Sequence, residues 1–196
     1  RDRDVTGVQT CALPIWFTGP NLRACGVDYD VRVMNPYSSY NEFEFDVPIG
    51  QSGDTYDRFM VRQEEMWQSL RIIEQAVAKL DQMDDKETYF APDPRFVLPP
   101  KEKVYNNMEA LIWHFKIVMG ETDIPPGEVY HSIEAANGEL GFYLVSDGGR
   151  TPSRLHFRRP CFIYYQAYPE MVIGNMLSDA VLTMSSMNVI AGELDA

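Results

Sequence analysis

The stretch that decides the fold is DTYDRFMVRQEEMWQSLRIIEQAVAKLDQM, residues 54–83. Large apolar side chains recur at intervals of three, four or seven positions, at Phe59, Met66, Leu70, Ile73, Val77 and Leu80. That spacing is typical of an amphipathic α-helix, and either Ser52 or Asp54 is suited to cap the first turn. We therefore predict one long helix over residues 54–82, with an apolar stripe along one face.

A second helix is predicted downstream, over residues 101–119. The preceding residues 81–100 carry four prolines and many charges, which is typical of a loop. The stretch PPKEKVYNNMEALIWHFKIVMG, residues 99–120, then starts with proline and ends with glycine, as many helices do. One face collects Val104, Met108, Leu111, Phe115 and Val118. Two long helices joined by a loop predict an antiparallel helical hairpin, half of a bundle.

The flanking regions predict strands and further helices. NEFEFDVPIG (41–50) alternates apolar and acidic residues, which favours a strand. GEVYHSIEA (127–135) and LGFYLVSDGG (140–149) surround an Asn-Gly turn and predict a β-hairpin, and SRLHFRRP (153–160) predicts a third strand. Residues 161–192 are consistent with one or two buried helices. The expected class is α+β, mainly α, with a small antiparallel sheet.

Composition limits the function classes. The chain has 196 residues, 45% of them hydrophobic, enough for one domain with a real core. The formal net charge of −12 argues against binding to nucleic acid or directly to anionic lipid. No uninterrupted apolar run reaches the roughly 20 residues of a membrane-spanning helix, so we expect any membrane role to act through partners.

The cysteines are not spaced like the ligands of a metal site, and the first residues do not resemble a secretory signal peptide. Cys11, Cys25 and Cys161 form no C-x-x-C pair, so the chain alone lacks the ligands of a zinc or iron–sulfur site. Sparse, odd cysteines suit a reducing compartment. The opening RDRDVTGVQTCALPIW has no period and no apolar core of a signal peptide. We expect residues 1–16 to be a foreign or disordered extension, and the domain to occupy 17–196.

Residue types alone do not make a complete active site. His114, His131 and His156 show no metal-ligand spacing, and His114 is more typical of a boundary residue than of a catalytic one. Arg154 and Arg158 lie on one face of the predicted third strand. They indicate either a solvated edge that prevents aggregation or a patch that faces a partner, and the pattern does not decide between these.

Longer blocks of sequence carry a resemblance to a known family. In order, the chain contains GPNLRACGVDYDVR (19–32), FDVPIGQSGDTYDRFMVRQEEMWQSLRII (45–73), PPGEVYHSIEAANGELGFYLVSDG (125–148), PSRLHFRRPCF (152–162) and GNMLSDAVLTMSSMNVIAGELD (174–195). From about Gly19 to Asp195 it resembles the C-terminal half of the quinone-site subunit of respiratory complex I. This is the D subunit of bacterial NADH-quinone oxidoreductase and the 49 kDa subunit of mitochondria.

The resemblance implies a fold and a site. The family is similar to the large subunit of nickel–iron hydrogenases, which implies a helical bundle. Where a hydrogenase has its C-terminal cysteine pair this chain has AGELD, so a nickel–iron centre cannot be held and no metal is expected. The implied quinone-cavity residues are Ile190, Gly192, Glu193 and Asp195. The alternative from residue types is an ordinary helix end, with Gly192 as the cap and solvated acids.

The resemblance also implies an activity and partners. The chain would be part of an NADH:quinone oxidoreductase, in which quinone is reduced beside an iron–sulfur cluster of the neighbouring B subunit and ion translocation is driven. Expected partners are the B and C subunits and the H subunit of the membrane arm, with Arg154 and Arg158 at a partner interface. The expected location is peripheral, on the cytoplasmic side of the bacterial inner membrane.

Several family features are altered or absent. The family's N-terminal half, which carries the His and Tyr that bind the quinone head group, is not in this sequence, so we expect the isolated chain to be inactive. Asn175 stands where the family usually has His, and Asn137 where it has Lys. Asn188 replaces a common Asp, and Ala196 a final Arg. Two alternatives remain: a non-catalytic scaffold subunit, and a membrane-bound hydrogenase catalytic subunit, which the missing cysteine pairs disfavour.

Overall fold

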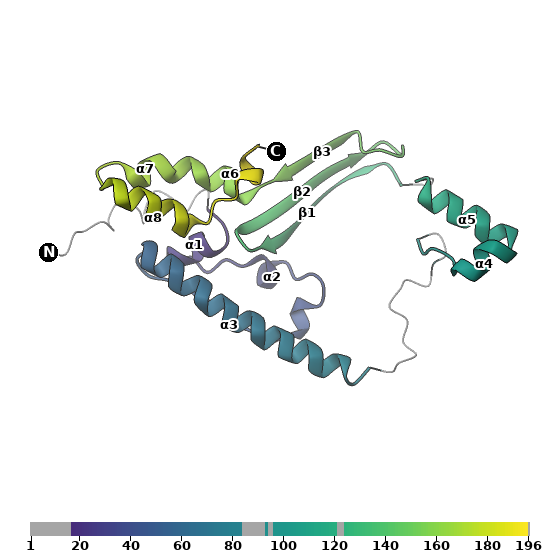
Figure 1. Cartoon of the computed structure of the whole chain (residues 1–196), viewed down its shortest axis with the longest axis horizontal. Coiled ribbons are helices and arrows are strands. Elements are labelled where there is room, and N and C mark those ends of the chain that lie inside the picture. The colour runs from purple at the N-terminus through teal and green to yellow at the C-terminus, as the bar shows by residue number, and fades with distance from the viewer. Residues whose placement is uncertain (1–16, 84–92, 94–95, 121–123, 196) are drawn as a thin grey trace. The chain divides into compact units, whose positions relative to one another are not determined.

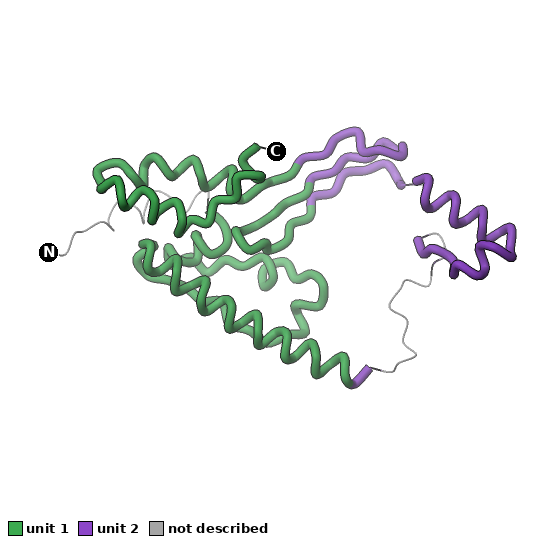
Figure 2. Tube along the Cα trace, viewed as in Figure 1, with its two compact units in different colours: residues 1–81, 131–142, 157–196 green, residues 82–130, 143–156 purple. Residues whose placement is uncertain are grey.

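The computed structural model of the chain describes residues 17–83, 93, 96–120 and 124–195. The chain divides into two compact units (Figure 2). The first comprises residues 1–81, 131–142 and 157–196, and the second comprises residues 82–130 and 143–156. The predicted N-terminal extension, residues 1–16, lies outside the described residues, so it stays a prediction.

The long helix predicted from residues 54–82 is α3, Thr55–Leu80 (Figure 1). Asp54 caps it, because its side chain accepts a hydrogen bond of 2.8 Å from the backbone N–H of Asp57. The apolar stripe, however, is not buried: its six side chains are 49–65% exposed. The buried residues of α3 are Arg58 and Val61 instead.

The polar flank of α3 makes its contacts within the first unit. Gln75 and Gln68 bond the backbone of Glu44 and Asp46 at 2.7–3.0 Å. The strand predicted over residues 41–50 is therefore wrong. The stretch forms a 3₁₀ turn, η1 (Tyr40–Glu42), followed by irregular chain. Alternation of apolar and polar residues favours an extended chain, but here glutamine side chains take the place of a neighbouring strand.

The second predicted helix is two helices, α4 (Lys101–Asn106) and α5 (Met108–Val118), both in the second unit. The break is at Asn107, whose backbone is extended and whose side chain accepts hydrogen bonds from the N–H groups of Glu109 and Ala110. An Asn in this role caps a new helix rather than continuing the old one. Because α3 and α5 belong to different units, their antiparallel pairing stays a prediction.

The predicted hairpin and third strand are confirmed. The three-stranded sheet contains β1 (Gly127–Ala135), β2 (Gly138–Ser146) and β3 (Arg154–Arg158), in the order β1-β2-β3. The hairpin turn packs closely on the start of α1 (Pro20–Ala24). A Cβ added to Gly19 would overlap the Cα of Gly138, and both glycines have positive φ, 67° and 136°. No larger residue fits this approach without a backbone shift.

The C-terminal region contains more breaks than predicted. Instead of one or two helices it forms α6 (Pro160–Tyr164), a 3₁₀ turn η2 (Tyr165–Ala167), α7 (Tyr168–Val172), α8 (Leu177–Met187) and α9 (Ala191–Asp195). Positive φ angles at Gly174 (85°) and Asn188 (57°) interrupt the helical run. The first unit also contains α2 (Val31–Met34). Its apolar core joins Phe17, Leu22, Cys161, Tyr164, Met171 and Met187. The α+β class is confirmed.

Candidate functional site

The candidate site surrounds the C-terminal segment, residues 188–195. α8 ends at Met187, and the chain turns at Asn188, which adopts the left-handed conformation (φ 57°, ψ 55°). Asn tolerates this region better than most residues. The alternative of an ordinary helix end with Gly192 as its cap is wrong, because Gly192 is the second residue of α9. The chain thus turns four residues earlier, and the segment after the turn packs back on the domain.

Side chains from α3 and α1 hold the last turn of α8. The Arg62 guanidinium donates to the carbonyl oxygens of Ser186 (2.6 Å) and Met187 (3.3 Å). The Asn21 side chain also donates to the Met187 carbonyl at 3.3 Å and accepts a bond from Arg62 at 2.9 Å. Carbonyl groups at a helix C-terminus lack intrahelical partners and carry partial negative charge. A cation at this position therefore satisfies both the hydrogen bonds and the helix dipole.

Arg58 lies one turn before Arg62 and is 1% exposed. It donates to the carbonyl of Gly53 at 2.8 Å, and to the hydroxyls of Thr55 and Ser186 at 3.0 and 3.1 Å. Burial lowers the pKa of Arg58 to about 10, and burial also lowers the pKa of Arg62. Both remain cations at neutral pH. Sequence reasoning missed this pair, although two arginines four residues apart on one helix face were the available signal.

A second set of hydrogen bonds fixes Asn188 from the other side. The Tyr164 hydroxyl donates to the Asn188 carbonyl at 3.0 Å and lies 2.8 Å from the Cys161 sulfur. The Asn188 side chain donates to Asn137 at 2.6 Å. Burial and the neighbouring Cys161 raise the pKa of Tyr164, and burial together with Glu193 raises the pKa of Cys161. Both groups therefore stay protonated at neutral pH, and Cys161 is a poor nucleophile.

The structure places the four predicted quinone-cavity residues in and just before α9. Glu193 is not solvated as the ordinary helix-end interpretation assumed, because its carboxylate accepts the backbone N–H of Cys161 at 3.0 Å. Ile190 is 47% exposed, and Gly192 and Asp195 are exposed as well. A Cβ on Gly192 would meet no atom of the described residues within 4 Å. Of these four residues, Glu193 is thus held by a hydrogen bond, and Ile190, Gly192 and Asp195 are exposed.

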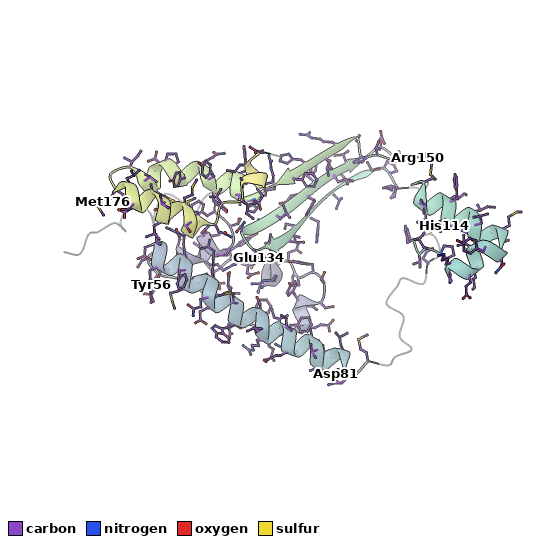
Figure 3. The ribbon with its side chains drawn as sticks, in the orientation of Figure 1. Tyr56, Asp81, His114, Glu134, Arg150 and Met176 are labelled. Atoms are coloured by element: carbon purple, nitrogen blue, oxygen red, sulfur yellow. The ribbon has the colours of Figure 1, made fainter. Side chains whose placement is uncertain are left out.

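Two cavities of the first unit meet at Arg62 and Asn188. One, of about 650 Å³, lies between the start of α3, where Figure 3 labels Tyr56, and the end of α8. It is lined by Thr55, Tyr56, Phe59, Arg62, Leu182, Ser185, Ser186 and Asn188. The other, of about 400 Å³, is lined half by charged side chains and also includes Arg62 and Asn188. Neither is lined by Ile190, Gly192, Glu193 or Asp195.

A buried cluster of charges borders the smaller cavity. Arg23 is the centre: its guanidinium bonds Glu65 and lies 2.8 Å from a carboxylate oxygen of Glu134 and 3.4 Å from one of Asp30. Arg32 binds the same Asp30 at 2.6 Å. Glu134 is on β1 and also accepts from a backbone N–H in α2 (Figure 3). The cluster therefore joins α1, α2, α3 and β1.

The carboxylates of this cluster differ in their proton affinity. Burial would raise the pKa of Asp30, but hydrogen bonds and charge from Arg32, with the charge of Arg23, outweigh burial and lower it. For Glu134 burial prevails over Arg23, and the pKa is raised. Sequence reasoning missed the cluster, because Arg23 and Glu134 are 111 residues apart and no local pattern pairs them.

The predicted basic strand is β3. Arg158 donates to the carbonyl of Glu139 at 2.8 Å and lies 3.7 Å from its carboxylate. Arg154 is exposed, with its guanidinium 5.9 Å from the centre of the Tyr143 ring. Arg158 therefore binds an acid of its own chain. The partner-facing role of the two arginines stays a prediction.

The three histidines lie on three different elements. His131 contacts the ring of Tyr37 edge-on, whereas His114 lies on α5 and His156 on β3. Within residues 17–83, 93, 96–120 and 124–195, no group of three or more His, Cys, Asp or Glu side chains could hold a metal ion. Among the helices formed by those same residues, none has the length and apolar character needed to cross a membrane.

Comparison with known proteins gives one family. Over residues 1–196 the chain matches the family described as respiratory-chain NADH dehydrogenase, 49 Kd subunit. It is 72% identical over 185 residues to the NADH-quinone oxidoreductase D 2 subunit of Cytophaga hutchinsonii, a match that covers 94% of this chain and 47% of that protein. It is 66% identical over 185 residues to the D subunit of Flavobacterium psychrophilum, with 94% and 44% covered.

A further relative carries two subunit letters in its name. The chain is 51% identical over 196 residues to the NADH-quinone oxidoreductase C/D subunit of Bdellovibrio bacteriovorus, a match that covers 100% of this chain and 34% of that protein. The chain spans about half the length of the D-subunit relatives it matches.

Proposed function

The chain belongs to the family of the 49 Kd subunit of respiratory-chain NADH dehydrogenase, and from this we propose that residues 17–196 form the C-terminal part of the D subunit of a complex I. In this proposal the C-terminal segment, residues 188–195, forms one wall of the cavity in which quinone is reduced. The names of the relatives, NADH-quinone oxidoreductase D subunits, support membership of this enzyme complex. The activity belongs to the assembled complex, and the chain by itself is inactive.

The observation that carries the proposal is a segment that is firmly held but open. Its first residue, Asn188, is bonded by Tyr164 and Asn137, and Glu193 is bonded by the backbone of Cys161. Between and beyond these points, Ile190, Gly192 and Asp195 remain exposed. A site of this kind needs fixed supports beneath the residues that meet the ligand. An unsupported chain end would not present the same surface each time.

The exposed residues suit a quinone ring. Ile190 offers an apolar side chain, and the open space beside Gly192 allows a flat ring to approach the backbone. Asp195 adds a polar carboxyl group beside the ring. The iron–sulfur cluster of the neighbouring B subunit would supply the electrons. This chain's residues bind and orient the ring and exclude water.

The proposal includes the surroundings of the chain. We infer a bundle similar to that of the hydrogenase large subunit, in which the exposed apolar stripe of α3 packs on other helices. The B, C and H subunits are the proposed partners, and the relative named as a C/D subunit supports the C subunit among them. The proposed location is peripheral, on the cytoplasmic side of the bacterial inner membrane.

The experiment uses two variants, Ile190→Met and Asp195→Ala, in the full-length subunit within the assembled complex. A change of side-chain shape in an apolar pocket is worth about 1–3 kcal/mol, so we expect Ile190→Met to shift the half-inhibiting concentration of a quinone-site inhibitor roughly tenfold. Asp195→Ala should lower quinone turnover. The matched control is Ile173→Met, which alters an exposed isoleucine at the end of α7.

Assembly is followed by NADH oxidation with an artificial acceptor that bypasses quinone, which should not change. Normal inhibitor response and turnover in both variants would contradict the cavity role. The chain would then be a non-catalytic scaffold whose C-terminal segment is only packed.

A further inference from the structure

Arg62 connects α3 to the part of the chain that leads into the proposed cavity wall. Its guanidinium bonds two successive carbonyl groups, those of Ser186 and Met187, and the C-terminal segment begins at the next residue. We propose that Arg62 is a positioning residue for quinone: it fixes the last turn of α8 and thereby sets where Ile190 and Asp195 lie. This inference rests on the proposed function.

The geometry favours a role of Arg62 in orienting the last turn of α8 rather than in the general stability of the domain. A planar guanidinium that donates to two neighbouring acceptors fixes orientation as well as distance. The rest of α8 is held in the domain by other buried residues, Ala180 and Thr183. Arg58 bonds the hydroxyl of Ser186, whereas the carbonyl groups of Ser186 and Met187 accept from Arg62 and Asn21. Loss of Arg62 therefore weakens the hold on the helix end, where Asn21 still bonds Met187 and Tyr164 still bonds Asn188, without removing the helix.

The environment of Arg62 shows that its placement is costly. Its Nε atom is buried and has no hydrogen-bond partner within the described part of the chain, and an unsatisfied buried donor is unfavourable. Two cavities border the side chain. What the guanidinium gains here is its fork of bonds to the end of α8 and to Asn21. A lysine could replace one of these bonds but not the fork.

The test uses Arg62→Met and Arg62→Lys in the full-length subunit of the assembled complex. The matched control is Arg71→Met, on the same helix, where the arginine pairs with Asp46 away from α8. We expect Arg62→Met to raise the KM for a short-chain quinone about tenfold while kcat changes less than about twofold, because the wall is displaced but the chemistry is kept. Arg62→Lys should restore part of the KM, and the control should match the parent enzyme.

A double variant separates positioning from packing. If Arg62 acts through the C-terminal segment, Ile190→Met should have a smaller effect on inhibitor sensitivity in the Arg62→Met background than alone. Should Arg62→Met fail to assemble, Arg62→Lys decides: a raised KM with normal artificial-acceptor activity supports the proposal, and an unchanged KM overturns it. Additive effects of the two substitutions also overturn it.

The two proposals fail in different ways. If Ile190→Met shifts inhibitor sensitivity but neither Arg62 variant changes the KM, the positioning role is wrong and the cavity role stands. If Ile190→Met, Asp195→Ala and the Arg62 variants all leave the quinone kinetics unchanged, the cavity role is wrong and the positioning role falls with it.

Discussion

Replacing Arg23 by methionine removes the cation at the centre of the buried cluster and keeps a side chain of similar length. Arg23 is 2% exposed at its side chain, and its partners include Asp30 at 0% and Glu134 at 5%. Methionine fills most of the space but leaves carboxylates in the interior. Among the described residues Asp30 keeps its ion pair with Arg32, whereas Glu134 and Glu65 keep only longer-range interactions with Arg32 and Arg62. The perturbation is therefore buried negative charge that has lost its nearest cation, rather than a cavity.

The magnitude follows from that charge. Breaking a buried ion pair by removal of one partner costs about 3–5 kcal/mol, a large part of the stability of an ordinary domain. The matched substitution Arg71→Met also breaks an ion pair, with Asp46, but Arg71 is 44% exposed. Exposed pairs contribute about 0–1 kcal/mol. The two substitutions should thus differ by several kcal/mol although each removes one arginine.

The pH dependence has a definite sign. In the parent chain Glu134 has a raised pKa, so its contribution is fully present below 4.5, its value in the unfolded chain, and is lost as the pH rises through the folded pKa. Asp30 has a lowered pKa, so its contribution is lost only as the pH falls below 3.8. Without Arg23 the carboxylates bind protons more readily. The cost of Arg23→Met should therefore shrink between pH 7 and pH 5.

The assay is unfolding of the 196-residue chain in guanidinium chloride, monitored by circular dichroism. It is carried out at pH 7 and at pH 5 for the parent, Arg23→Met and Arg71→Met. The free energy of unfolding is compared at each pH. A loss at pH 7 no larger for Arg23→Met than for Arg71→Met would refute the reasoning. So would a cost for Arg23→Met that grows on acidification, because protonation of the remaining acids must relieve the unpaired charge.

Two further predictions concern surfaces that are exposed here. In the full-length subunit, Leu70→Ala and Leu111→Ala should each cost about 2–5 kcal/mol if α3 and α5 pack antiparallel; thermal unfolding that is unchanged by both would contradict the pairing. Arg154→Glu combined with Arg158→Glu should weaken assembly of the complex in a salt-sensitive way and leave the fold intact. Because Arg158 already binds Glu139, Arg154→Glu alone is the sharper variant, and unchanged co-purification of the other subunits would favour a solvated strand edge.

The elements that could be predicted from the sequence are those determined by residues close to one another in the sequence. Helix α3 follows from its period and from Asp54 as cap, and the hairpin follows from Asn137 and Gly138 at the turn. The errors arise where one polar residue changes the backbone direction. Asn107 caps a new helix in the middle of an apolar pattern, and Asn188 ends α8 without a glycine. Periodicity of apolar residues carries no information about such breaks.

The candidate site could be predicted only in part, because its supports come from distant segments. The resemblance to the family identified the C-terminal segment, residues 188–195. The residues that hold it could not be paired from the sequence, since Arg62 and Ser186 are 124 positions apart and Asn21 and Met187 are 166 apart. Composition shows that such polar residues exist. It does not show which of them meet in the folded chain.

The two faces of α3 explain why the strongest signal in the sequence did not identify the core. The face that binds the first unit is polar, and it works through directed bonds from Arg62, Gln68 and Gln75. The apolar stripe, at least 49% exposed at each position, contacts little in the described residues. An exposed stripe of this length marks an interaction surface. The relatives are about twice as long as this chain. We therefore expect the apolar stripe to pack against other parts of the whole subunit, whereas the polar face makes the contacts of the fold described here.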